Sequence, residues 1–384
     1  GRFAGVLKPL KAVELGAIAI KEAVNRAGIQ PEQVEYLYYG QVVQAGCGQV
    51  PGRQAGLKAG LPVEVPSVTL NKVCSSGIIG IGIAYKLIAA GFMDVAVAGG
   101  MESMSNCPYA VPDLRWGQRM GVPYGKTIDL MVWDGLWCAI YNRHMAIHGS
   151  EVAREFGLDR EPQDRWAVRS QNRAEAAIKA GKMKDEIVPV TIPGKKPVVV
   201  DTDEAPRFGC TYEDIAKLPP VFDPNGTVTA GNAPGTNDGA SALVVMSREK
   251  ADELGIKPLA TILGYAEVSQ EPRYIATVPG LSIKKALTEK GMSIDDMDII
   301  EINEAFAAVA LTSGKAILGL SDEVMDEKVN VNGSAIAFGH PIGATGGRIV
   351  MTACYELKRR GGGLAACGIC SGAAQGDAIL LKVE

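Results

Sequence analysis

Two features that mark large classes of proteins are missing from the sequence. There is no excess of basic residues, because 39 Lys and Arg stand against 43 Asp and Glu and give a net charge of −4. This balance argues against a nucleic-acid or membrane-surface footprint. The longest apolar run, Ile78 to Met93, contains Lys86 and several glycines and is shorter than the roughly 20 residues that span a membrane. We therefore expect neither a nucleic-acid partner nor a membrane segment.

Histidine is also scarce, because the 384 residues contain only His144, His148 and His340. Eight cysteines are scattered along the chain, and the close pair Cys367 and Cys370 has no second pair of ligands for a structural zinc site. We therefore predict no metal site. Since there is neither a compact disulfide framework nor a signal-peptide pattern, we expect reduced thiols and a cytoplasmic protein.

What is present is the composition of a globular enzyme, with 47% hydrophobic residues and 46 glycines. The length favours two or three domains. The chain begins at Gly1 without a Met, and no strand precedes the first predicted helix, Ala12 to Ala27. We therefore expect a segment upstream of Gly1 that the sequence does not include.

Cys74 stands where a predicted strand ending at Leu70 passes into a predicted helix that runs on from Ile78. Free N–H groups and the helix dipole at such a position lower the pKa of a thiol and make it a nucleophile. The alternative is a buried, inert cysteine. The helix is apolar almost all round and contains Gly80 and Gly82, so we expect it to lie between two layers and to pack closely against something large.

The second half of the sequence repeats the first. Residues 23–37 align without a gap on residues 286–300, a shift of 263 positions. The same shift carries Cys74 to Ala337, three residues before His340, and there too a predicted strand, Val329 to Asn332, precedes a helix that runs to Arg360. The repeat predicts a duplicated α/β core, with two buried helices between two sheets and with Cys74 and His340 at one centre.

Between the two halves, the residue pattern is that of polar loops with one strongly amphipathic helix, Pro162 to Lys179. We predict an inserted loop domain over residues 107–235. The N-terminal half of the core then comprises residues 1–106 and 236–256, and the C-terminal half residues 257–384.

Three further motifs lie in the second half. Asn303-Glu304-Ala305-Phe306 follows a predicted strand, Gly339-His340-Pro341 opens the second helix, and Cys370-Ser371-Gly372 closes another strand. Taken singly, each has a structural alternative: a helix cap by Asn303, a histidine in a turn, and a tight hairpin.

Together with the Cys74 motif, and in the same order, these motifs resemble those of the thiolase family, the acetyl-CoA acetyltransferases and 3-ketoacyl-CoA thiolases. The resemblance runs from Gly1 to Glu384. It implies a five-layered αβαβα fold, an inserted loop domain that holds coenzyme A, and a homodimer or homotetramer. It also implies reversible condensation of two acetyl-CoA to acetoacetyl-CoA, or thiolysis of 3-ketoacyl-CoA, with no metal or prosthetic group.

The resemblance assigns chemical roles as well. His340 takes the proton of Cys74, whose thiolate accepts the acyl group, and Cys370 then acts as acid and base. One oxyanion site is implied at His340 with a water held by Asn303, and another at the backbone N–H groups of Cys74 and Gly372.

Coenzyme A and the acyl group are expected to meet a further set of residues, for which ordinary surface charge is the alternative at His144 and Arg207. Pro234 stands where the family commonly has Ser, and Ile275 where short-chain members commonly have Met, so acyl length stays open. The expected set is His144, Met145, Arg207, Phe222, Pro234 and Phe306.

Two other functions remain open. A ketoacyl synthase-like condensing enzyme would typically carry a second histidine where this chain has Cys370. A non-catalytic acyl-CoA-binding paralogue would be expected to have lost Cys74, His340 or Cys370, and all three are present. Because two thiols are expected in one pocket, mild oxidation could also link Cys74 to Cys370.

Overall fold

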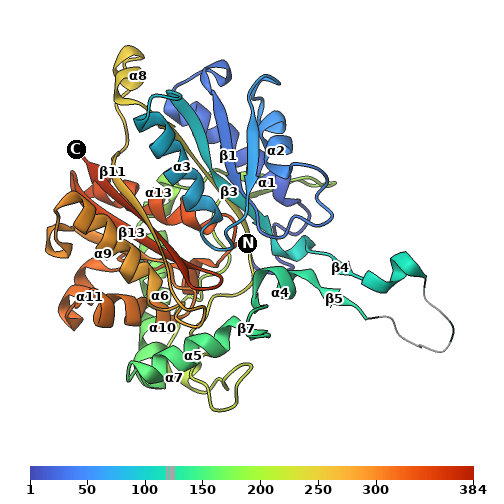
Figure 1. Cartoon of the computed structure of the whole chain (residues 1–384), viewed down its shortest axis with the longest axis vertical. Helices are drawn as coiled ribbons and strands as arrows, with labels where there is room; N and C mark the ends of the chain where they lie inside the picture. The colour runs from blue at the N-terminus through green and yellow to red at the C-terminus, as the bar shows by residue number, and fades with distance from the viewer. Residues whose placement is uncertain (118–119, 121–125) are drawn as a thin grey trace.

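The computed structural model describes residues 1–117, 120 and 126–384. Two four-stranded sheets form the core, and Figure 1 shows them side by side with helices between and outside them. The order in the first sheet is β10 (Asp238–Met246), β3 (Val95–Ser103), β1 (Tyr36–Gly40) and β2 (Ser67–Leu70). The order in the second is β11 (Thr261–Ser269), β14 (Gln375–Val383), β13 (Gly363–Ser371) and β12 (Ile299–Ile302).

Helices cover both outer faces of the sheets and fill the space between them. α1 (Ala12–Ala27) and α2 (Pro51–Ala59) pack on the first sheet, and α9 (Val278–Lys290) packs on the second. α3 (Ser76–Ala89) and α13 (Thr345–Arg360) contact strands of both sheets and each other. The predicted αβαβα layering of a duplicated core is therefore confirmed.

Glycines let the two central helices pack closely. A Cβ at Gly77 would lie 2.9 Å from the backbone N of Gly347, so the N-terminal turns of α3 and α13 touch through their backbones. Further along α3, a Cβ at Gly82 would lie 2.5 Å from the ring of Tyr265, and one at Gly80 would lie 2.9 Å from a strand carbonyl. The expectation of close packing around Gly80 and Gly82 is confirmed. The contact between the N-terminal turns of α3 and α13 brings Cys74 and His340 to the same end of the core.

Three strands of each sheet correspond: β10, β3 and β1 of the first sheet match β14, β13 and β12 of the second, and the fourth strands, β2 and β11, lie at opposite edges. The central strands β3 and β13 are each flanked by an antiparallel strand on one side and a parallel strand on the other. β11 pairs with the far edge of β14. Among the described residues no strand occupies the matching place beside β10, and a groove of about 1000 Å³ lies there, lined by β10, α1 and α13.

The strand predicted at Val329 to Asn332 is wrong, because it is reduced to a single bridge between Val329 and Ile300. Asn330 adopts a left-handed conformation with φ 48°. Its side chain accepts a hydrogen bond from Ile302 N and donates one to Ile302 O, both at 2.8 Å. An amide side chain thus replaces the strand ladder here, which apolar periodicity does not reveal.

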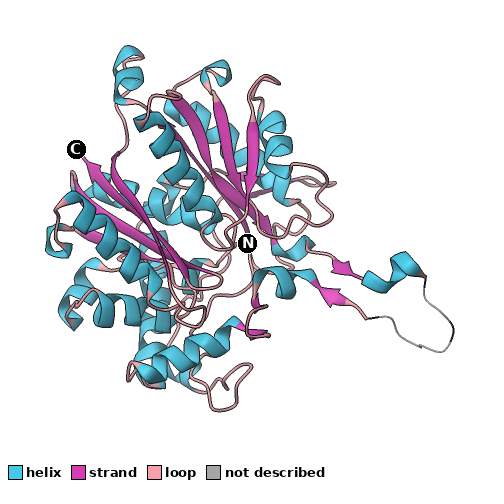
Figure 2. Ribbon diagram, viewed as in Figure 1, coloured by secondary structure: helices cyan, strands magenta, loops and turns pink. Residues whose placement is uncertain are grey.

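The described residues of 107–235 add no strand to either central sheet. Short hairpins project from the body, as Figure 2 shows for β4 and β5. The predicted amphipathic helix is confirmed as α6, which begins two residues earlier than expected. The helices are α4 (Leu130–Gly135), α5 (Met145–Glu155), α6 (Arg160–Lys179) and α7 (Tyr212–Ala216), and the strands β4 (Tyr109–Ala110), β5 (Ile128–Asp129), β6 (Trp137–Cys138), β7 (Arg143–His144), β8 (Val190–Ile192) and β9 (Val198–Val200).

The remaining helices are short: α8 (Arg248–Glu253), α10 (Ala307–Leu311), α11 (Asp322–Lys328) and α12 (Ala335–Phe338). No helix in the described part of the chain has the length and apolar character that crossing a membrane requires.

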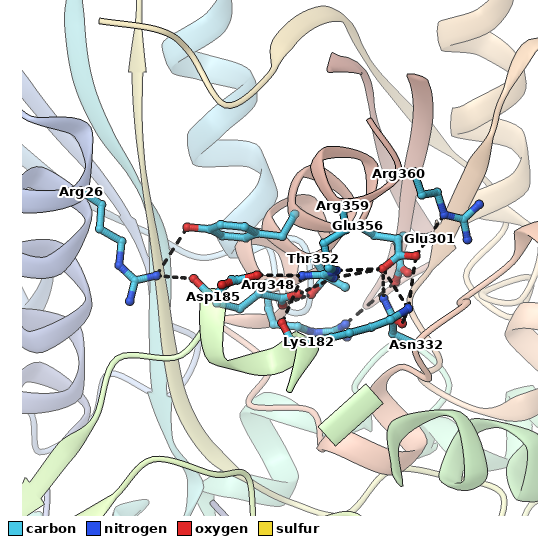
Figure 3. Close-up of polar contacts among 12 residues, drawn as sticks. Arg26, Lys182, Asp185, Glu301, Asn332, Arg348, Thr352, Glu356, Arg359 and Arg360 are labelled. Atoms are coloured by element: carbon cyan, nitrogen blue, oxygen red, sulfur yellow. Dashed lines mark hydrogen bonds and ion pairs between the residues drawn. The ribbon is translucent and has the colours of Figure 1, made fainter. Parts of the chain in front are cut away.

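A charged network ties the inserted region to α13 (Figure 3). Glu356 accepts hydrogen bonds from Asn332 at 2.9 Å and from Arg360 at 3.0 Å, and its carboxylate lies 3.3 Å from Lys182 Nζ. Burial opposes the charge on Glu356, but these partners outweigh it and lower its pKa to about 2. The last turns of α13, the helix that follows His340, are therefore tied to Asn332 and to Lys182.

Candidate active site

Cys74 and His340 meet at the centre of the molecule, as the repeat predicts. Cys74 lies in the turn between β2 and α3, His340 lies in the turn before α13, and Cys74 Sγ is 3.1 Å from His340 Nε2. Both side chains are buried, with 8% and 6% exposed. A nucleophile and a base are therefore within hydrogen-bonding distance in a site largely closed to water.

Thr345 fixes the tautomer of His340. Its hydroxyl donates to Pro341 O at 3.0 Å, so the same oxygen is left to accept from His340 Nδ1 at 2.8 Å. With its proton on Nδ1, the ring presents the lone pair of Nε2 to the Cys74 thiol. Sequence reasoning missed Thr345, although its place five residues after His340, at the first turn of the helix, was a usable signal.

The backbone of the histidine turn is held by Asn237, the residue that precedes β10. His340 N donates to Asn237 Oδ1 at 2.9 Å. Gly339 adopts φ 97°, and a Cβ there would lie 2.4 Å from the Asn237 amide, so only glycine fits.

Burial sets the charge state of the pair. It raises the pKa of Cys74 to about 12 and lowers that of His340 to about 3, the second effect reinforced by Arg348. The expectation of a lowered pKa for Cys74 is therefore wrong, because burial outweighs the backbone N–H hydrogen bond that favours its thiolate. At rest the site holds a neutral thiol and a neutral imidazole, and the proton moves only when the thiol attacks.

Cys370 lies at the end of β13 and is fully buried. Burial first, and then the neighbouring Cys74, raise its pKa well above the ordinary value. The turn that follows brings Gly372 against the Cys74 loop, since a Cβ there would lie 3.0 Å from Val73 Cγ2. Cys74, Cys370 and Gly372 thus gather around one point.

Asn303 follows β12 and is fully buried, and neither atom of its side-chain amide has a hydrogen-bond partner among the described residues. Buried amides are almost always satisfied by protein or water. Helix capping by Asn303 is not what the structure shows, because α10 begins only at Ala307. The amide is free to hold a water or a substrate oxygen.

Glu304, next to Asn303, links the inserted region to the core. Its carboxylate accepts from Trp166 Nε1 at 2.9 Å, Ser170 Oγ at 2.7 Å, Asn330 Nδ2 at 3.1 Å and the backbone N of Ile336 at 3.1 Å. One buried carboxylate thereby joins α6 to the segment before His340, a role that sequence reasoning did not assign.

Glu102 of β3 braces the site from the other side. It accepts hydrogen bonds from the backbone N–H groups of Val42, Val43 and Gly343 at 3.0, 3.2 and 3.0 Å. Burial raises its pKa to about 7 in spite of these donors. The histidine turn is therefore fastened to the first half of the core, which the sequence did not indicate.

Two of the residues expected to contact coenzyme A, His144 and Phe222, lie against each other in the inserted region. The rings of His144 and Phe222 stack with centroids 3.6 Å apart. His144 Nδ1 accepts from Ala146 N and burial lowers its pKa to about 4, so the neutral ring keeps an N–H on Nε2. Phe306 packs against α5, since a Cβ at Gly149 would lie 2.9 Å from its ring.

Met145 belongs to the same buried apolar cluster as Phe306. The other two expected residues stand apart from this contact. The Arg207 side chain is exposed, and its backbone N donates to Gln171 Oε1 at 2.7 Å. Pro234 is half-buried in the loop before β10. In the described part of the chain no group of three or more His, Cys, Asp or Glu is arranged to hold a metal ion.

A paired thiol and imidazole, a second thiol and an unpartnered amide at the junction of two repeated halves define an acyl-transfer centre. Comparison with known proteins agrees. The thiolase N-terminal domain matches residues 1–249 and the thiolase C-terminal domain residues 256–383. The acetyl-CoA acetyltransferases of Cupriavidus necator and Syntrophomonas wolfei are 49% and 47% identical, each aligned over 100% of this chain and 96% of the relative.

The crystal structure of the Bacillus anthracis acetyl-CoA acetyltransferase superimposes with a TM-score of 0.95 at 41% identity, over 100% of this chain and 96% of that one. The chain belongs to the thiolase family.

Proposed function

We propose that this thiolase is an acyl-CoA:acetyl-CoA C-acyltransferase that condenses two acetyl-CoA reversibly to acetoacetyl-CoA and thiolyses 3-ketoacyl-CoA. The main support for this function is the 3.1 Å distance between Cys74 Sγ and His340 Nε2. The hydroxyl group of Thr345 fixes the tautomer of that histidine ring. The function is also supported by the relatives' names, acetyl-CoA acetyltransferase.

In the first half-reaction, Cys74 Sγ attacks the carbonyl carbon of an acyl-CoA as its proton passes to His340 Nε2. The carbon–sulfur bond to coenzyme A breaks, the coenzyme thiolate takes up the proton, and the acyl group remains on Cys74. Since both partners begin neutral, charge develops only in the transition state, where buried donors stabilise it most strongly.

In the second half-reaction, the proton of Cys370 passes to His340, which is neutral again once coenzyme A has left, and the Cys370 thiolate removes a proton from the methyl group of acetyl-CoA. The resulting carbanion attacks the acyl-Cys74 carbonyl carbon, the bond between that carbon and Cys74 Sγ breaks, and the Cys74 thiolate takes up the proton held by His340. Burial raises the pKa of Cys370 well above its ordinary value, so Cys370 keeps its proton until a base accepts it.

The two thioester oxygens need separate stabilisation. We assign one oxygen to His340 together with a water held by Asn303, whose buried amide lacks a protein partner among the described residues. The other is assigned to the backbone N–H groups of Cys74 and Gly372.

We further propose that residues 107–235 form the coenzyme A-holding domain between core halves 1–106 with 236–256 and 257–384. His144, Met145, Arg207, Phe222, Pro234 and Phe306 would meet the coenzyme and the acyl group. We also propose that the protein is a homodimer or homotetramer, that its reaction uses no prosthetic group, and that it is cytoplasmic. The cytoplasmic location is supported by the cysteines, because all eight are free thiols.

The experiment is to incubate the protein with acetyl-CoA and to map acetylated peptides by mass spectrometry. We expect one acetyl group on Cys74, none in Cys74→Ser, and release on adding coenzyme A. The Cys138→Ser variant, which alters a buried cysteine of the inserted region, is the matched control and should acetylate normally. Absence of the Cys74 adduct in the unaltered protein would overturn the mechanism. Rates with acetoacetyl-CoA and longer 3-ketoacyl-CoAs would then define acyl length.

A further inference from the structure

Lys72 stands two residues before Cys74, yet its ammonium group reaches the other half of the core. Lys72 Nζ lies 2.9 Å from Asp377 Oδ1 and 2.8 Å from Glu267 Oε2. The Lys72 side chain is 11% exposed and that of Asp377 is fully buried. Burial opposes the charge on Lys72, but the two carboxylates outweigh it and raise its pKa. None of the steps described above uses this charge.

The charges of this cluster are divided between the two halves of the core. Both cations, Lys72 and Lys86, come from the first half, and both carboxylates, Glu267 on β11 and Asp377 on β14, come from the second. Tyr265 of β11 donates its hydroxyl hydrogen to Asp377. The cluster is therefore neutral as a whole, and its contacts form only when the halves are in register.

Packing joins the same cluster to the helix that begins at the nucleophile turn. The ring of Tyr265 fills the space over Gly82 of α3, and Lys86 Nζ lies 4.7 Å from the centre of that ring. A shift of α3 relative to the second sheet would thus break the ion pairs and the aromatic contact together.

The nucleophile turn needs such an anchor because its backbone is strained. Val73, between Lys72 and Cys74, adopts a left-handed conformation with φ 44°, which a β-branched residue rarely adopts.

The backbone of Lys72 also contacts the second sheet. Ser371, the neighbour of Cys370, donates its hydroxyl hydrogen to Lys72 O. Asp377 is in turn one residue from Gly376, which pairs with Cys370 in the β13–β14 ladder. Lys72 is thereby bound through both its backbone and its side chain to the strands that carry the second thiol.

A buried ion pair contributes little net stability compared with an apolar pair, and its best-attested use is to fix one arrangement among several. We propose that Lys72 is a positioning residue: its ion pairs with Asp377 and Glu267 hold the strained Cys74 turn in register with His340 and Cys370. This proposal rests on the acyl-transfer function proposed above.

The test compares Lys72→Met, which keeps the aliphatic stem, with Lys72→Arg, which keeps the charge. Lys86→Met is the matched control, because it removes the other cation on Glu267 without touching the Cys74 turn. We expect Lys72→Met to lower kcat for thiolysis roughly 10- to 100-fold, with KM for coenzyme A changed less than about twofold. Lys72→Arg should recover most of that loss, and Lys86→Met should retain kcat within about twofold.

A second readout does not depend on acyl transfer. The rate at which iodoacetamide alkylates Cys74, followed on the Cys74 peptide by mass spectrometry, should fall about 10-fold or more in Lys72→Met, because the thiol no longer meets its base. If the unaltered protein failed to form an acetyl adduct but this rate still fell, the proposed function would be wrong and the positioning role would stand.

Lys72→Met leaves the Asp377 charge buried without its partner and is the variant at risk of unfolding. The double variant Lys72→Met/Asp377→Asn removes both charges and avoids this. We expect it to unfold near the temperature of the unaltered protein and yet to remain about as slow as predicted for Lys72→Met. Unaltered kcat and Cys74 alkylation in the double variant, or a loss in Lys86→Met equal to that in Lys72→Met, would overturn the proposal.

Discussion

Two regions of the molecule build the site, and they do so differently. At the centre, Cys74, His340 and Cys370 are no more than 8% exposed; Cys74 and His340 lie in turns next to helix starts, and Cys370 lies at the end of β13. On the inserted region, Phe222 is 61% exposed and the Arg207 side chain is exposed. The groups that break and form bonds are thus positioned by the fold itself, whereas Phe222 and Arg207, both expected at the coenzyme, have exposed surface left for a ligand to contact. Substitutions at the centre should change kcat, and substitutions at the coenzyme surface should change KM.

The largest effect is expected from His340→Asn. Without the base, the neutral thiol of Cys74 has no acceptor for its proton, so kcat should fall by about 10³-fold or more while KM stays within a few-fold. Steady-state thiolysis measures both constants. A large rise in KM with an unchanged kcat would place His340 among the binding residues and not among the residues that react.

Glu304→Ala tests the link between the two regions. It leaves donors on Trp166, Ser170 and Ile336 buried without their acceptor, which should destabilise the protein by about 3 kcal/mol in denaturant unfolding. Glu304→Gln keeps the side-chain oxygen and should lose less. Equal stability of Glu304→Ala and the unaltered protein would show that the regions are joined by other contacts.

Thr345→Val tests whether the tautomer of His340 matters. The methyl group cannot accept from Nδ1, so we expect kcat to fall about 10-fold, equivalent to about 1.4 kcal/mol, with little change in KM. Thr345→Ser keeps the hydroxyl and serves as control. A kcat for Thr345→Val equal to that of Thr345→Ser would contradict the role given to this hydroxyl.

The smallest effect is expected from Phe222→Ala at the coenzyme surface. Loss of the stack on His144 should raise KM for coenzyme A about 3- to 10-fold, about 1 kcal/mol, and leave kcat unchanged. Tyr109→Ala, at an exposed aromatic of the projecting hairpin, should leave both constants unaltered. A fall in kcat for Phe222→Ala would mean that the coenzyme surface also positions the reacting groups.

The sequence predicted the layered core and the meeting of Cys74 with His340, because both follow from an ungapped internal repeat and from apolar helices that need two buried faces. It did not predict the side chains whose hydrogen bonds hold the site residues in place. Glu102 and Glu304 accept several hydrogen bonds each from residues far away in the sequence, and Thr345 acts through its hydroxyl group alone. Such contacts leave no periodic pattern of apolar residues. The pKa of Cys74 was predicted in the wrong direction, because a helix-terminus argument needs the degree of burial, which only the folded chain supplies.

The proposed first half-reaction starts from a resting site that holds a neutral thiol and a neutral imidazole. The direct measurement is the ultraviolet absorbance of the thiolate near neutral pH, taken as the difference between the unaltered protein and Cys74→Ser so that the other cysteines cancel. Because burial raises the pKa of Cys74 to about 12, we predict no thiolate signal in this difference. A signal equal to one thiolate would show an ion pair at rest and would contradict the account.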